Sequence, residues 1–226
     1  MHILRLLWEY HEPLLSGLSI TIGLSIVAMA AAILLGLLMC VAAISPLKVI
    51  RLPAFFVVEF CRNTPILVQL IWVHFALPVM IGVKFSPLMS AFIALTMQSS
   101  GYLAEEYRAG IESIERGQVE AALSLGMTKS RMMRRIVLPQ AIIRMIPGIL
   151  NQFVTCVKST SIVSVIAVPD LMYQAGLIVS ATFVAMPIWT FTALVYFLLV
   201  MAVSSMVRYA SSHLPSMGRV GELRHA

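Results

Sequence analysis

A long apolar run near the start of the chain restricts the possible folds more than any other feature. It occupies residues 14–44 and is followed by Ser45-Pro46. The apolar core of a signal peptide has roughly 7 to 15 residues, whereas about 20 residues are needed to cross a bilayer. The run is therefore expected to be a tilted membrane span. Small residues at every fourth position would let a neighbouring helix approach one side of it closely: Ala28, Ala32, Gly36 and Cys40.

Composition supports a membrane protein independently. Of the 226 residues, 60% are hydrophobic and 12% are charged, whereas average soluble chains carry about 25% charged residues. Too few polar residues are present to coat a soluble globule, so the surface should face lipid or other spans. The net charge of +6 comes from basic residues beside apolar runs, which is the positive-inside pattern and does not indicate nucleic-acid binding.

Four further apolar stretches predict an all-α membrane protein with about five transmembrane helices. They lie at about residues 66–82, 88–105, 139–157 and 187–207. Residues 161–185 are also apolar but are interrupted by a proline, an aspartate and a glycine, so we expect an outer loop there, with either a short helix or a partial re-entry into the membrane. The three cysteines lie in apolar surroundings without metal-like spacing and are interpreted as small hydrophobic residues.

The distribution of basic residues predicts the orientation of the chain. Five spans put the two ends on opposite sides, and with the N-terminus outside, twelve basic residues fall on the inner side and three on the outer side. We therefore expect an outer, periplasmic segment at residues 1–13, a membrane domain at residues 14–210 and a cytoplasmic tail at residues 211–226. The inner residues are Lys48, Arg51, Arg62, the six between residues 108 and 135, Arg208, Arg219 and Arg224; the outer ones are Arg5, Lys84 and Lys158.

The longest polar interval, residues 108–140, is predicted to be a structured cytoplasmic loop. Its many Ala, Leu, Met, Glu and Arg residues favour two short amphipathic helices, at residues 118–125 and 129–137. Gly126 would end the first in the left-handed conformation, Thr128 would cap the second, and Pro139 would open the next span. Such a helix pair is either a docking element or a hairpin that covers loop ends.

The same loop carries a family resemblance. Glu120-Ala121-Ala122, then Gly126, then Ile136-x-Leu138-Pro139 resemble the cytoplasmic EAA motif of ATP-binding-cassette (ABC) importer permeases. The block at residues 62–65, Arg-Asn-Thr-Pro, is similar to the usual Arg-Gly-Thr-Pro, and residues 158–161, Lys-Ser-Thr-Ser, are similar to the usual Lys-Asp-Thr-Ser. Together these blocks resemble polar amino-acid permeases of the histidine, glutamine and glutamate type, over roughly residues 14–210.

The resemblance implies a type I ABC-importer permease core with a cytoplasmic coupling helix. The coupling loop would cover about residues 108–138, and its ATPase-contacting residues would be Gly117, Glu120, Ala121, Ala122 and Gly126. The implied partners are a cytoplasmic ABC ATPase dimer, a second permease subunit of the same or a homologous kind, and a periplasmic or surface substrate-binding protein. Amino-acid transport at the bacterial inner membrane, by a multi-pass chain that binds no nucleic acid, is the implied function.

Catalysis by this chain is not expected. Val157-Lys158-Ser159-Thr160 matches the end of a P-loop, but Gln152 and Val157 stand where the phosphate-binding glycines are needed. No serine elbow and no histidine pair with zinc spacing occurs. We therefore expect a transport subunit without a cofactor or metal of its own, with ATP and Mg²⁺ bound by the partner ATPase.

A polar cluster near the end of the fourth span suggests a substrate path. Ser159 replaces the acid that the family often has after the lysine, and the nearby helix face offers Gln152 in place of a carboxylate. We therefore expect a neutral or acidic polar amino acid as substrate, not a cationic one. The alternative is that Lys158 only anchors the span at the outer interface. The candidate path residues are Gln69, Gln98, Gln152, Thr155, Lys158, Ser159 and Thr160.

A stand-alone ion-driven transporter or channel is the competing hypothesis. Intramembrane carboxylates or inverted repeats would favour it, but no internal repeat is visible and Glu105 is the only acid expected to be well buried. Gln98, Tyr102 and Glu105 share one helix face, which either lines a path or lies at the cytoplasmic interface with Glu105 pairing with Arg108. His74 is expected to bond to a neighbouring helix, not to relay protons.

Overall fold

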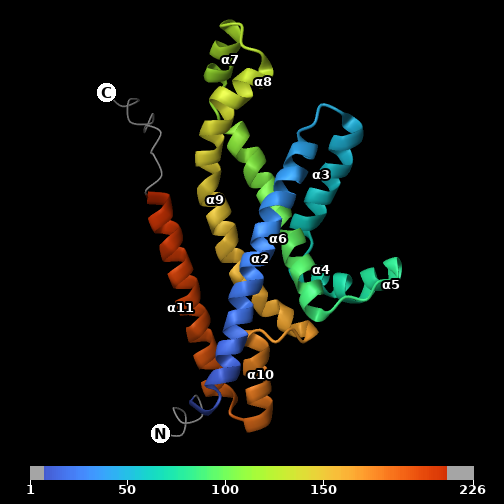
Figure 1. Cartoon of the computed structure of the whole chain (residues 1–226), viewed down its shortest axis with the longest axis vertical. Helices are drawn as coiled ribbons and strands as arrows, with labels where there is room; N and C mark the ends of the chain where they lie inside the picture. The colour runs from blue at the N-terminus through green and yellow to red at the C-terminus, as the bar shows by residue number, and fades with distance from the viewer. Residues whose placement is uncertain (1–7, 213–226) are drawn as a thin grey trace.

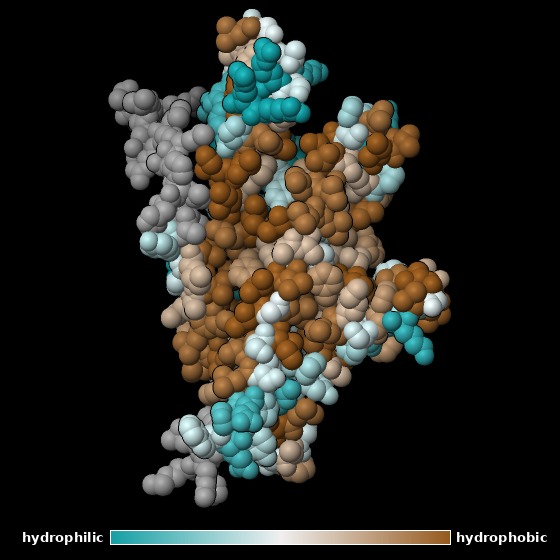
Figure 2. Space-filling model, in the orientation of Figure 1, coloured by the Kyte–Doolittle hydropathy of each residue, from teal (hydrophilic) through white to brown (hydrophobic). Residues whose placement is uncertain are grey.

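The computed structural model describes residues 8–212, and this part of the chain is helical (Figure 1). Figure 2 shows a broad apolar belt between two polar ends, one of them formed by α7 and α8. The residues beyond this range, among them Arg5, Arg219 and Arg224, lie outside the described part. The elements are α2 (His11–Ala43), α3 (Lys48–Asn63), α4 (Ile66–Ile71), the π-helical turn η1 (Trp72–Ala76), α5 (Leu77–Ile81), α6 (Pro87–Glu112), α7 (Arg116–Ser124), α8 (Lys129–Met132), the π-helical turn η2 (Met133–Val137), α9 (Leu138–Ser159), the 3₁₀ helix η3 (Thr160–Ile166), α10 (Leu171–Thr182) and α11 (Ala185–Ser212).

The packing of α2 against α6 forms the centre of the bundle. The small stripe predicted on the first span faces α6: Ala28 and Ala32 are completely buried, and a Cβ placed on Gly36 would lie 2.9 Å from the Cβ of Leu103. The Tyr107 hydroxyl on α6 donates to the carbonyl of Ile33 at 3.2 Å. The close approach of the two helices therefore depends on the small residues, as predicted.

The five expected spans can each be matched to helices of the structure. Three stretches are long and apolar enough to cross a membrane, namely His11–Ala43, Lys129–Ile166 and Ala185–Tyr209, and the bent pair Lys48–Asn63 with Ile66–Ile81 makes a fourth if it counts as one span. We assign α6 as the fifth. It has 26 residues, or about 39 Å, and packs against α2, α3 and α9, so it is covered by protein and can carry more polar residues.

The second span agrees with the predicted residues 66–82, because α4, η1 and α5 follow one another without a gap from Ile66 to Ile81. The helix α3 before it was not predicted, and the chain bends by 109° between α3 and α4. Thr64 is extended because Pro65 follows it, and Pro65 has no amide hydrogen to continue the ladder of α3. No helix was predicted for the charged residues of α3, although α3 packs against α2 and α6.

The segment between the last two spans contains a short helix, as predicted. It consists of η3, a left-handed residue at Ala167, and the 12-residue helix α10. Asp170 caps α10 by accepting a hydrogen bond from the Tyr173 amide at 2.9 Å. The cysteines are also as predicted: Cys40, Cys61 and Cys156 are buried and free.

Candidate functional site: the α7–α8 loop and the polar residues of α9

The helix α7 ends in a glycine turn, as the sequence predicts. Gly126 has φ +75°, and its amide donates to the carbonyl of Leu123 at 2.9 Å. The amide of Met127 donates to the carbonyl of Ala122 at 3.1 Å, which completes a Schellman motif with Gly126 in the left-handed position. The helix begins two residues earlier than predicted, at Arg116.

The second predicted helix of the loop is not a separate element. Thr128 caps α8, as predicted, by accepting a hydrogen bond from the Arg131 amide at 3.4 Å. However, α8 continues through the π-helical turn η2 directly into α9, so that residues 129–166 form one helical stretch. Pro139 explains the wide turn, because its ring would clash with the carbonyl of Arg135 in a regular α-helix.

Side chains fix α7 to the beginning of α9. Ala122 is 1% exposed and packs in one apolar cluster with Met132 and Val137. The Gln140 amide nitrogen donates to the Gln118 side-chain oxygen at 2.6 Å. Ala122 thus faces the protein's own helices, and α7 and α9 are held together as a unit.

The outward side of α7 and its turn forms an exposed surface at one end of the molecule (Figure 1). Gly117, Glu120, Ala121 and Gly126 are exposed there, and a Cβ on either glycine would meet no atom within 4 Å. Leu125 is 82% exposed beside them. Leu125 was not among the predicted contact residues. Its position in the sequence, as a large apolar residue directly before the turn glycine, could have indicated it.

Ion pairs gather where α3 meets α6. Arg108 pairs with Glu105 and, at 2.7 Å, with Glu112, while Arg62 pairs with Glu59 at 3.0 Å and with Glu105 at 3.7 Å. Of the two interpretations of Glu105, the structure shows the paired one. Its carboxylate joins the end of α3 to α6.

The polar residues of α9 point in different directions. Gln152 is 9% exposed, and its amide nitrogen lies 3.4 Å from the Ser99 hydroxyl on α6. Thr155 is exposed and donates to the carbonyl of Asn151 at 3.1 Å, and Ser159 is half-buried. The cluster predicted on one face therefore divides into an inner contact with α6 and an outer, solvent- or lipid-facing part.

Lys158 lines an open cavity with a volume of about 780 Å³. Ligand sites typically have volumes of about 300–1,000 Å³, so an amino acid fits. Lys158 is the only charged residue in its lining, and α11 contributes most of the wall. The sequence did not reveal the α11 residues, because an aromatic side chain on a span is equally typical of a lipid-facing position. The lining residues are Lys158, Ser161, Met172, Trp189, Thr192, Ala193, Tyr196, Phe197 and Val200.

A buried acid lies behind this cavity, contrary to the expectation that Glu105 is the only well-buried one. Asp170 is completely buried, whereas the Glu105 side chain is 29% exposed. The Tyr196 hydroxyl, from the cavity wall, donates to Asp170 at 3.3 Å. Burial raises the pKa of Asp170 to about 6, and the Tyr173 amide opposes that rise. The burial of Asp170 could not be predicted from the sequence, because the residues that cover it belong to helices that are distant in the sequence.

Gln69 lies at the bend of the second span. It is 1% exposed, and its amide nitrogen donates to the carbonyls of Cys61 at 2.8 Å and Thr64 at 2.9 Å. In an unbroken helix, the Cys61 carbonyl would accept from residue 65, which is the proline. The Gln69 side chain therefore replaces the donor that Pro65 lacks.

The other candidate residues are spread over the bundle. Gln98 is half-buried on α6, and Thr160 is completely buried and donates to the carbonyl of Val157 at 2.7 Å. His74 lies 2.8 Å from the Ser90 hydroxyl on α6, which confirms that it bonds to a neighbouring helix. The structure thus places Lys158 in the cavity but does not bring Gln69 or Gln98 into its lining.

A family model for the inner-membrane component of binding-protein-dependent transport systems matches residues 32–214. The chain belongs to this family. Its fold is the all-helical one expected for a type I ABC-importer permease. A crystal structure of an amino acid ABC transporter with histidines matches with a TM-score of 0.88 and 35% identity, over 92% of this chain and 97% of that one.

Curated relatives agree with this membership. The probable glutamine ABC transporter permease protein GlnM of Bacillus subtilis is 38% identical over 92% of this chain and 96% of its own length. The arginine transport system permease protein ArtQ of the same organism is 35% identical over 83% of this chain and 86% of its own length. The MetNI methionine ABC transporter shares the fold at 20% identity, with a TM-score of 0.67.

Proposed function

We propose that this chain is the permease subunit of an ABC importer for a polar amino acid. Its relatives are permease proteins of glutamine, arginine and other amino-acid ABC transporters. The observation that carries the proposal is the exposed α7 surface fixed to the beginning of α9, because a helix of this kind can transmit movement of an attached protein to a span. The loop lies in the cytoplasm and the N-terminus outside, in the orientation that the basic residues favour.

The partners follow from this role. A cytoplasmic ATPase dimer binds ATP and Mg²⁺ and receives α7, with Gly117, Glu120, Ala121 and Gly126 at the contact and Ala122 supporting the helix from behind. A second permease subunit and a substrate-binding protein complete the importer. Closure of the ATPase dimer moves the α7 helices of the two permeases and rocks the spans between inward and outward openings, as rigid bodies.

The cavity beside Lys158 is the proposed position of the substrate path. An unopposed lysine can hold the α-carboxylate of an amino acid, and no acid lines the cavity to hold a cationic side chain. Both oxygens of the nearby Asp170 accept hydrogen bonds from groups of the protein, namely the Tyr173 amide and the Tyr196 hydroxyl. The charge distribution favours a neutral or acidic amino acid over arginine or lysine.

Reconstituted transport tests this proposal. The permease, its ATPase and its binding protein in proteoliposomes should take up glutamine only when ATP is enclosed and the binding protein is added. Excess arginine should leave glutamine uptake unchanged. Strong uptake of arginine would contradict the substrate assignment while leaving the importer assignment intact.

The buried Asp170 keeps one alternative in view, an ion-driven transporter that uses this carboxylate. Uptake driven by a proton or sodium gradient without ATP, and lost in Asp170→Asn, would support that alternative. Uptake that needs ATP and persists in Asp170→Asn would exclude it.

A further inference from the structure

An apolar groove lies between α2 and α9, with α6 as its floor. Figure 1 shows α2 and α9 diverging toward the α7–α8 end, and a cavity of about 430 Å³ lies between them. Leu37 and Val41 of α2 form one wall, and Met133, Ile142 and Ile146 form the other. Tyr107 of α6 also lines the groove, but its hydroxyl is already bonded, because it donates to the carbonyl of Ile33 on α2.

The groove opens to the outside of the chain. Val41 is 57% exposed and Ile142 is 50% exposed, although both line the cavity. The groove also reaches Ile44, which caps the C-terminal end of α2, and Leu138, which begins α9. It therefore occupies the half of the bundle next to the α7–α8 loop and belongs to the apolar belt seen in Figure 2.

Basic side chains stand at the end of this groove. Arg134 and Arg135 belong to the π-helical turn η2, directly after the groove residue Met133 and about one turn before the groove residue Leu138. Lys129 precedes Met133 by four residues, which is about one helical turn. All three are exposed, and the ion pairs of residues 8–212 involve only Arg62 and Arg108 as bases, so these three charges have no acidic partner there.

We infer that the groove is a binding site for an anionic phospholipid, with an acyl chain between α2 and α9 and the phosphate beside Arg134 and Arg135. An acyl chain matches an apolar groove that opens toward lipid, and a guanidinium group binds phosphate oxygens through two parallel hydrogen bonds. Basic pockets between spans on the cytoplasmic side are suited to anionic lipid head groups. The inference rests on the proposed orientation, which places the groove in the cytoplasmic leaflet.

The site is separate from the proposed ATPase contact. The outward surface of α7 is formed by Gly117, Glu120, Ala121 and Gly126, none of which lines the groove. An ATPase bound at the tip therefore leaves the groove in the membrane. A second permease copy is the other occupant that an apolar groove could accept, and the experiments distinguish it.

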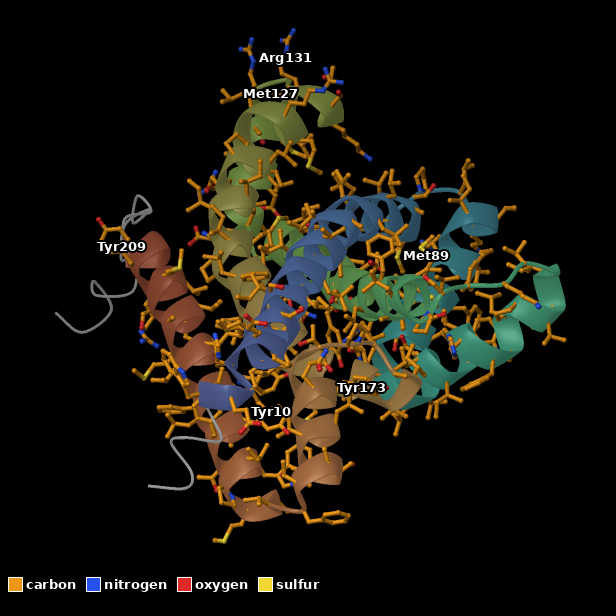
Figure 3. All side chains as sticks on the ribbon, turned by 60° about the horizontal axis from the view of Figure 1, so that its bottom comes forward. Tyr10, Met89, Met127, Arg131, Tyr173 and Tyr209 are labelled. Carbon is orange, nitrogen blue, oxygen red and sulfur yellow. The ribbon has the colours of Figure 1, made fainter. Side chains whose placement is uncertain are left out.

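The charge arm of the test compares two double variants with the same loss of charge. Arg134→Gln with Arg135→Gln removes the residues beside the groove, whereas Arg116→Gln with Arg131→Gln removes charges elsewhere on the loop; Figure 3 shows Arg131 at its far tip. The full-length chain is titrated with phosphatidylglycerol and with phosphatidylcholine of the same acyl chains, and bound lipid is counted by native mass spectrometry. The first pair should weaken phosphatidylglycerol binding about tenfold or more and leave phosphatidylcholine unchanged. Equal loss in both pairs, or no preference for phosphatidylglycerol in the unmodified chain, would overturn the inference.

The shape arm fills the groove. Ile146→Trp should reduce retention of both lipids severalfold, while Leu194→Trp, at an exposed position of α11 that lines none of the described cavities, should not. Cross-linking of Ile142→Cys between two copies, together with unchanged lipid counts in Ile146→Trp, would identify a second copy as the occupant and refute the lipid site. Lipid counts do not depend on ATP or transport, so a failure of the importer proposal would leave this result interpretable.

Discussion

Replacing Gly126 by aspartate should separate assembly with the ATPase from folding of the chain. A residue other than glycine costs about 1–2 kcal/mol in the left-handed conformation, and aspartate is among the residues that adopt it most readily. A Cβ at this position meets no atom within 4 Å, so no steric term is added. That cost is small against the roughly 5–15 kcal/mol of a folded protein, and we expect normal insertion.

The effect on the proposed interface is much larger. The new carboxylate would lie on the exposed turn that ends α7, where the proposed partner must approach closely. Loss of a hot-spot residue at an interface costs at least about 2 kcal/mol, which weakens association about thirtyfold. Affinity purification of the ATPase should therefore recover little Gly126→Asp permease, while the membrane fraction contains it at the normal level.

Gly82 supplies a matched control, because it also has positive φ, +72°, and open space around its Cβ, but it ends α5 far from the loop. Gly82→Asp carries the same backbone cost and the same charge and should co-purify normally. Recovery of a normal complex with Gly126→Asp, or equal loss with Gly82→Asp, would refute the assignment of this turn to the contact.

Three other perturbations test separate parts of the structure. Gln69→Leu removes the side-chain donor to the carbonyls of Cys61 and Thr64 and should lower the free energy of unfolding by about 2–4 kcal/mol. The loss is measured as a lower melting temperature in detergent. An unchanged melting temperature would disprove the role of this side chain at the bend. Because burial raises the pKa of Asp170 to about 6, the folded chain keeps a proton that the unfolded chain releases from about pH 4 upward, so stability should fall as pH rises from about 4 to 6. Asp170→Asn should show a flatter pH dependence of the melting temperature, and identical curves would contradict this reasoning. Lys158→Gln should raise KM for uptake about tenfold or more through loss of a charge-assisted contact, whereas Thr155→Val should not, and equal KM values would favour the interpretation of Lys158 as an interface anchor.

The elements that the sequence predicted well are those encoded by neighbouring residues. The apolar run of the first span, the left-handed Gly126 and the Thr128 cap each depend on a few adjacent positions, and all three are present. The small stripe of α2 could also be read from its spacing, although the sequence did not say that α6 is the helix that contacts it.

The elements that were missed depend on contacts between distant residues. The helix α3 carries Glu59 and Arg62, and Arg62 also pairs with Glu105 of α6, a contact between distant parts of the sequence that the pattern of α3 alone does not indicate. Asp170 is buried by helices far from it in the sequence, and its bond to Tyr196 is invisible without the fold. The continuity of α8 with α9 depends on a π-helical turn before Pro139, whereas the sequence prediction took this proline only as the beginning of the next span.

Because α8 continues into α9, the stretch from Lys129 to Lys158 can move as one rigid body. At 1.5 Å per residue it is about 45 Å long, and it connects the tip of the molecule to the cavity on the opposite side of the bundle. Rotating such a rod by about 5° around one end moves the other end by about 4 Å, which is about the width of a methyl group. In the proposed importer, a small tilt imposed at the tip would therefore be enough to open or close the cavity beside Lys158, without unwinding any helix.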